Sequence, residues 1–130
     1  MRTGNLSLLF GEWIDRALSG ELPDGIAAFH FNMYDGPETH DVEIVGCPTY
    51  DPNDSDWACD DIFMSAEPRF ELPHTVVGEH WESALAAAMQ MLGAYMKSDA
   101  VGARRMRRSQ AVSIGFVDGN LHLVWSGKSA

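Results

Sequence analysis

The segment from Ile26 to Gly46 reads IAAFHFNMYDGPETHDVEIVG, and its pattern decides the fold. Apolar and polar side chains alternate over residues 26–34 and again over residues 41–46, which is the period of a β-strand with one buried face. The break Asp35-Gly36-Pro37 lies between the two runs. We therefore predict two antiparallel strands joined by a loop around residues 37–40. The apolar positions of these strands are Ala27, Phe29, Phe31, Met33, Val42 and Ile44.

Two segments with helical spacing lie on either side of this pair. The first follows Asn5, a candidate N-cap, and ends near Gly20; the second runs from Trp81 to Met96. The apolar stripe of the first contains Leu6, Leu9, Phe10, Trp13, Ile14, Ala17 and Leu18, and that of the second contains Trp81, Leu85, Ala88, Met89, Leu92, Tyr95 and Met96. Each stripe predicts a helix that packs one side against a core.

The remaining segments complete the predicted sheet. Residues 112–116 and 121–125 alternate around the turn Asp118-Gly119-Asn120, which indicates a hairpin, and residues 62–64 predict a short third strand. Residues 70–77 contain Pro73 and are expected to be irregular. Residues 1–130 are therefore expected to form a single α+β domain: an antiparallel sheet of about five strands with two main helices packed on one face.

The charge of the chain is unevenly distributed. Between Glu21 and Glu82 there are fifteen of the nineteen carboxylates and one cation, Arg69, so this segment carries a net charge of −14 while the whole chain carries −10. Such an imbalance bears on partners and solubility rather than on fold. The only basic cluster is Arg104, Arg105, Arg107 and Arg108; we interpret it as a solvated helix end or an internal counter-charge rather than a nucleic-acid site.

The composition indicates in which compartment the protein is found and whether its cysteines are reduced. The apolar start of the chain is too short for a signal peptide, and no stretch has the ~18 apolar residues that a membrane span requires. Cys47 and Cys59 are too few for a disulfide scaffold. We expect a cytoplasmic protein with two reduced thiols and no membrane contact.

No motif for catalysis, a cofactor or a metal is present. The loop that starts at Asp51 places oxygen side chains like the start of an EF-hand, but Asp56 stands where Gly is required and Ile62 where a bidentate Glu is required. The five histidines and two cysteines have none of the close pair spacings of a zinc site. We predict no catalytic residue, no metal ligand and no cofactor.

One loop combines charge with a large aromatic side chain. Trp57 lies among carboxylates that we predict to be exposed, and it has two interpretations: an exposed anchor for a partner, or a side chain that fixes the loop to the core. The predicted partner-binding residues are Asp51, Asp54, Asp56, Trp57, Asp60 and Asp61.

Four short stretches support a family resemblance: residues 30–34 (HFNMY), 42–46 (VEIVG), 56–60 (DWACD) and 114–121 (IGFVDGNL). In this layout the chain resembles the small acidic immunity proteins of bacterial contact-dependent and polymorphic toxin systems. The resemblance covers most of the chain but carries over no active-site residue. It implies a non-enzymatic cytoplasmic protein that binds and blocks one toxin.

Three classes of function remain open at this stage. The first is an immunity-like protein whose acidic face covers a cognate toxin or another basic protein, without direct contact to nucleic acid. The second is a small-molecule enzyme in which His30, His122 and Glu43 converge in a pocket. The third is an acidic mimic of nucleic acid, which requires carboxylates spaced along a ridge.

Overall fold

The computed structural model describes residues 3–127. The helices are α1 (Thr3–Ala17), the short 3-10 helix η1 (Ser55–Cys59), α2 (His74–Val77), α3 (Trp81–Met96) and α4 (Val101–Met106). The strands are β1 (Ala28–Asp35), β2 (Thr39–Cys47), β3 (Phe63–Met64), β4 (Phe70–Pro73), β5 (Ala111–Phe116) and β6 (His122–Ser126). The predicted α+β class is confirmed.

All six strands belong to one sheet with the order β3-β2-β1-β5-β6, and β4 also pairs with β2. The predicted β1–β2 hairpin is antiparallel and places Phe31 opposite Ile44. One pair differs from the predicted antiparallel sheet, because β5 runs parallel to β1, with Ile114 opposite Phe31. The reason is the long helical connection through α3 and α4, which returns the chain to the sheet in the direction of β1.

The expectation that residues 70–77 are irregular is wrong. Residues 70–73 form β4 and residues 74–77 form α2. Pro73 is compatible with β4 because it is the last residue of the strand, opposite Thr39. The other edge of β4 pairs with no described strand, so the missing N–H of the proline interrupts no ladder there. The predicted strand at residues 62–64 is confirmed as the two-residue strand β3.

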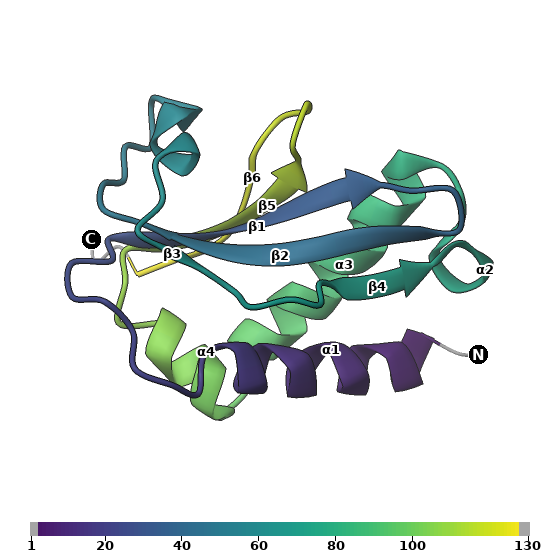
Figure 1. Ribbon diagram of the computed structural model, residues 1–130, viewed down its shortest axis with the longest axis horizontal. Coiled ribbons are helices and arrows are strands. Elements are labelled where there is room, and N and C mark those ends of the chain that lie inside the picture. The colour runs from purple at the N-terminus through teal and green to yellow at the C-terminus, as the bar shows by residue number, and fades with distance from the viewer. Residues whose placement is uncertain (1–2, 128–130) are drawn as a thin grey trace.

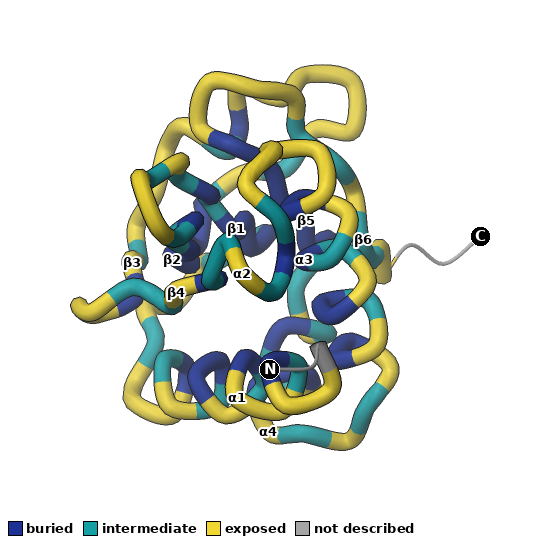
Figure 2. The backbone as a smooth tube through the Cα atoms, turned by 90° about the vertical axis from the view of Figure 1, so that its right-hand side faces the viewer, coloured by how far each residue is buried: buried dark blue, intermediate teal, exposed yellow. Residues whose placement is uncertain are grey.

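The helices α1, α3 and α4 cover one face of the sheet, as Figure 1 shows. The apolar alternation of β1, β2 and β5 faces these helices and forms the main core. In Figure 2 the buried, dark blue segments lie within the sheet and along α1 and α3. Helix α1 begins at Thr3, two residues before the predicted cap Asn5. Helix α4 was not predicted as a separate helix, since its sequence was interpreted only as a basic cluster. No helix among the described residues has the length and apolar character needed to cross a bilayer.

The opposite face of the sheet carries a second, smaller apolar cluster. It consists of Ala28, Val45, Cys47, Trp57 and Ala111, with Tyr50, Ala58 and Leu121 packed against it. The segment 48–62, which includes η1, lies over this face, on the side away from the helices (Figure 1). The sheet is therefore buried on one side by helices and partly on the other side by a loop.

Candidate functional site: an acidic loop over the outer face of the sheet

The segment 48–62, which we name the acidic loop, presents its carboxylates to solvent. Asp51, Asp54, Asp56, Asp60 and Asp61 are all exposed. Two of them also shape the loop: the Asp54 carboxylate accepts the N–H of Asp56 at 3.0 Å and caps η1, and Asp51 accepts the N–H of Asn53 at 2.9 Å. The predicted exposure of this group is confirmed, whereas its contact with a partner stays a prediction.

Trp57 decides between the two interpretations of the loop. Its side chain is buried, with 5% relative exposure, and its ring lies edge-to-face with Tyr50 at 5.2 Å and with His30 at 6.2 Å between centroids. Trp57 is thus not an exposed anchor but the residue that fixes the loop to the sheet. A 3-10 turn places the indole on the inner side while the adjacent aspartates point outward, and burial of so large an aromatic surface favours this arrangement.

The charges of the loop have no ion-pair partner among the described residues. In residues 3–127 none of the five aspartates forms an ion pair. No group of three His, Cys, Asp or Glu side chains in the same range is arranged to hold a metal ion. The five carboxylates consequently repel one another at close range on a loop of fixed conformation.

Beside the apolar cluster beneath the loop, the outer face of the sheet also carries buried polar side chains. His30 in β1 and Ser113 in β5 are both buried, and His30 Nδ1 lies 2.7 Å from Ser113 Oγ. Burial lowers the pKa of His30 to about 4, and a side-chain hydrogen bond with Asn32 opposes this shift. The imidazole therefore stays neutral at physiological pH.

A second polar group surrounds Glu43, which is buried in β2. Its Oε1 accepts hydrogen bonds from the Tyr34 hydroxyl and from Asn32 Nδ2, and Arg69 Nε lies 3.8 Å from its Oε2. The Arg69 guanidinium stacks over the Tyr34 ring at 3.8 Å from the centroid. Burial and the bond to Glu43 raise the pKa of Tyr34 to about 12.

Sequence reasoning did not find these two groups as connected networks. The available indication was the alternation of polar residues at 30, 32 and 34, which places three polar side chains on the face opposite the core. What the sequence could not indicate was which strand lies beside β1. The partner Ser113 is 83 residues away, and it follows only from the parallel β1–β5 pairing.

The structure does not bring together the residues of the predicted enzyme pocket. His30 is in β1 and His122 in β6, with β5 between them, and the two histidines line separate cavities. Glu43 lines neither of those cavities. The His30–Ser113 pair has the distance of a base and a nucleophile, but Ser113 has no exposed surface, so its hydroxyl is closed to a substrate.

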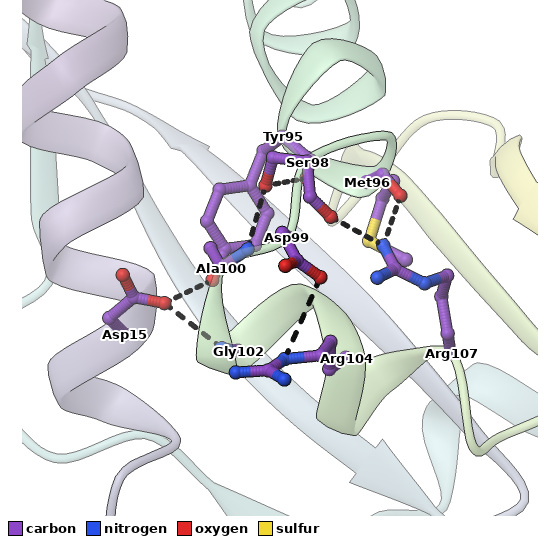
Figure 3. Close-up of polar contacts among 9 residues, drawn as sticks. All are labelled: Asp15, Tyr95, Met96, Ser98, Asp99, Ala100, Gly102, Arg104 and Arg107. Carbon is purple, nitrogen blue, oxygen red and sulfur yellow. Dashed lines mark hydrogen bonds and ion pairs between the residues drawn. The ribbon is translucent and has the colours of Figure 1, made fainter.

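The basic cluster has a structural role for two of its four members. Arg105 donates from Nη1 to the carbonyls of Leu18 and Gly20, just after α1, and Arg107 donates to those of Met96 at 2.6 Å and Ser98 at 2.9 Å, at the end of α3. Figure 3 shows Arg107 directed at these carbonyls, while Arg104 lies 3.9 Å from the Asp99 carboxylate. Cations at helix C-termini bind unpaired carbonyls and offset the helix dipole. Arg105 and Arg107 therefore bind carbonyls at helix ends, whereas the role of the cluster as a counter-charge to the acidic face stays a prediction.

The two cysteines are unpaired: Cys47 is buried and Cys59 is exposed. Burial, with a smaller contribution from the charges of Asp61 and Asp60, raises the pKa of the Cys47 thiol to about 12. Cys47 is therefore an inert apolar side chain of the second core cluster.

Comparison with protein-family models, with curated proteins and with solved structures gives no significant match to this chain.

Proposed function

We propose that the protein is a non-enzymatic, cytoplasmic binding protein of the immunity type, which neutralises a basic toxin domain by covering it with the acidic loop. The observation that carries this proposal is the display of Asp51, Asp54, Asp56, Asp60 and Asp61 on a loop that Trp57 holds in place. Unpaired carboxylates that repel one another lower stability, so their retention is explained best by a positively charged partner.

The fixed conformation of the loop supports binding. A loop that is already ordered loses little conformational entropy on association, and its charges are placed before the partner arrives. Complementary charge also accelerates the diffusional encounter and disfavours acidic partners. A rigid acidic surface is consequently suited to rapid and selective capture of a basic protein.

The buried polar groups favour binding over catalysis. Ser113 is inaccessible, and Glu43 is occupied by Tyr34, Asn32 and Arg69. Tyr34 and Asn32 donate hydrogen bonds to Glu43, as expected of groups that order the outer face of the sheet.

The test takes as candidate toxin a protein of basic composition encoded by a neighbouring gene. Both proteins are expressed in the same cells, and growth with and without the present protein measures neutralisation. Association of the purified pair is then followed by stopped-flow or surface plasmon resonance at low and high salt. We expect restored growth, and an association rate that falls steeply with ionic strength.

A loop variant identifies the surface. Changing Asp54, Asp56, Asp60 and Asp61 together to Asn removes four charges yet keeps a capping side chain at 54. The matched control changes four exposed acids outside the loop, Glu12→Gln, Glu21→Gln, Asp24→Asn and Asp99→Asn. We expect the loop variant to fold as well as the wild type and to associate at least about tenfold more slowly, and the control to change much less. Equal association rates for the two variants would place the interface elsewhere, and failure to restore growth would contradict the proposal.

A further inference from the structure

One cavity of the described chain lies beside the start of α3. Its volume is about 580 Å³, and it lies between the end of β1, the first turns of α3 and the turn that joins β5 to β6. The polar and aromatic side chains that line it include Asp35, Trp81, Phe116, Asp118 and His122, and Leu85 adds an aliphatic side chain. This size suits a small organic group.

Two aromatic side chains form the apolar part of this cavity. Trp81 is the first residue of α3, and half of its surface is exposed although its spacing predicts a core position. Its ring lies edge-to-face with that of Phe116, which is buried, at 6.2 Å between centroids. Leu85 is also buried. The cavity thus has a buried apolar wall and an accessible tryptophan at its margin.

The charged groups of the cavity are both carboxylates. Asp35 already pairs with His40, whose Nδ1 lies 2.9 Å from Asp35 Oδ1 and whose Nε2 donates to the Gly78 carbonyl at 3.0 Å, so its charge is offset within the protein. Asp118 forms no ion pair with any residue in the range 3–127. The lining contains no lysine or arginine, so the cavity repels anions and attracts cations.

We propose that this cavity binds an organic cation, an alkylammonium or guanidinium group, with Trp81 supplying a cation–π contact and Asp118 supplying the counter-charge. Tryptophan is the strongest of the aromatic partners for such a cation. A bare metal ion fits less well, because the described residues contain no group of three metal-binding side chains. The cation belongs to a free amine or to a lysine or arginine side chain of another protein. No residue of the acidic loop lines this cavity, although Phe116, Gly119 and Asn120 also line the neighbouring cavity under that loop. The test of the site requires no protein partner.

The experiment is an NMR titration of the full chain with n-butylammonium chloride. The indole N–H of Trp81 is assigned by its loss in Trp81→Leu, and the amide of Leu85, which lines this cavity but not the cavity under the acidic loop, reports independently. We expect saturable shifts of these resonances, with no comparable shifts from n-butanol or sodium butyrate. Equal shifts from n-butanol would mean an apolar cleft without charge selectivity, and unmoved resonances would overturn the proposal.

Two variants test the named residues. Asp118→Asn removes one charge at the cavity, and Asp99→Asn removes one charge from a side chain that is 92% exposed and lies between α3 and α4. We expect Asp118→Asn and Trp81→Leu each to weaken butylammonium binding about fivefold or more, and Asp99→Asn to leave it nearly unchanged. Wild-type affinity in Asp118→Asn would overturn the assignment, and the amide spectrum shows whether each variant is folded.

A second arm identifies the source of the cation. The peptide acetyl-Gly-Lys-Gly-amide is titrated under the same conditions, with its lysine-acetylated form as the neutral control. Binding at least tenfold tighter than that of butylammonium assigns the cavity to a side chain of a partner protein. Equal or weaker binding of the peptide assigns it to a free amine. Binding of the acetylated peptide as tight as that of the charged one would overturn the proposal.

Discussion

Tyr95 of α3 donates its phenolic hydrogen to Oδ1 of Asp15 in α1 across 2.5 Å, and the backbone N–H of Gly102 in α4 donates to the same oxygen at 3.0 Å (Figure 3). One carboxylate therefore joins three helices that lie on the same face of the sheet. Burial and the contact with Asp15 raise the pKa of Tyr95, so its hydroxyl stays protonated and remains a donor.

The first prediction concerns the close approach at Gly102. A Cβ at this position would lie 2.2 Å from the Tyr95 hydroxyl and 3.1 Å from Asp15 Oδ1, so Gly102→Ala must displace the bond between α1 and α3. We expect a loss of about 2 kcal/mol in the free energy of unfolding, measured with urea. The control is Gly93→Ala in the last turn of α3, where a Cβ meets nothing within 4 Å and where we expect a gain of about 0.5–1 kcal/mol. Equal effects of the two substitutions would contradict the packing described here.

The second prediction concerns the buried Glu43. Tyr34→Phe removes the hydroxyl that donates to Glu43 Oε1 and leaves a buried carboxylate with weaker partners. We expect a destabilisation of about 1–3 kcal/mol in urea unfolding. Tyr50→Phe is the matched control, because the Tyr50 ring packs on Trp57 and its hydroxyl bonds to no described side chain. If the two phenylalanine variants were equally stable, the Tyr34–Glu43 bond would contribute nothing.

The third prediction is a dependence of stability on pH that originates in His30. Its pKa is about 4 in the folded protein and 6.5 in the unfolded chain, so the unfolded state binds the proton first as the pH falls. His30 does not change the free energy of unfolding above about pH 6.5. As the pH falls, its protonation in the unfolded chain lowers that free energy, by roughly 3 kcal/mol below about pH 4. Unfolding of the wild type and of His30→Gln is compared from pH 7.5 to 4.5, because the difference removes the shared titration of the carboxylates. The wild type should lose more stability than the variant; parallel curves would mean that His30 does not titrate in this way.

The fourth prediction separates the members of the basic cluster. Arg107→Met keeps an apolar stem but removes the donor to the carbonyls of Met96 and Ser98, so we expect a loss of about 1–2 kcal/mol. Arg108→Met is expected to change stability by less than about 0.5 kcal/mol, because the Arg108 side chain is exposed and donates to no described carbonyl. Thermal and urea unfolding measure both. An equal loss in the two variants would indicate a general charge effect instead of a cap on α3.

The parts of the fold that follow from local periodicity were predictable from the sequence. The alternation in residues 26–46 defines the β1–β2 pair, and the stripe of Phe10, Ile14 and Leu18 defines the buried side of α1. Helix α4 has only six residues, which is too short for a repeated apolar pattern, and two of the six are arginines. Its sequence therefore did not indicate a separate helix. The parallel β1–β5 pairing could not be predicted, because it depends on where the helical connection returns the chain.

The charge of the candidate site was predictable from the sequence, but the burial of Trp57 beneath it was not. Alternating carboxylates in the loop indicate exposure, and Asp56 and Asp60 are exposed. The position of Trp57 depends on contacts with Tyr50 and with His30 on another strand, which no local pattern contains. The cavity beside Trp81 was not found for a similar reason, since Trp81 fits the helical stripe and its exposure depends on where α3 begins relative to Phe116.

The parallel β1–β5 pair also fixes the order in which the chain can fold. The β1–β2 hairpin closes over the three residues 36–38, whereas the β1–β5 pair must bring together residues 28–33 and 111–116. Closing so long a loop costs more conformational entropy than closing the hairpin, so the central pairing is the slow step. During synthesis, one edge of β1 stays unpaired until β5 has been made, so Phe31 has no contact with Ile114 until residue 116 has been added. A nascent chain that stops short of β5 therefore exposes an apolar strand at the position that becomes the middle of the sheet, and such an edge favours association with other chains.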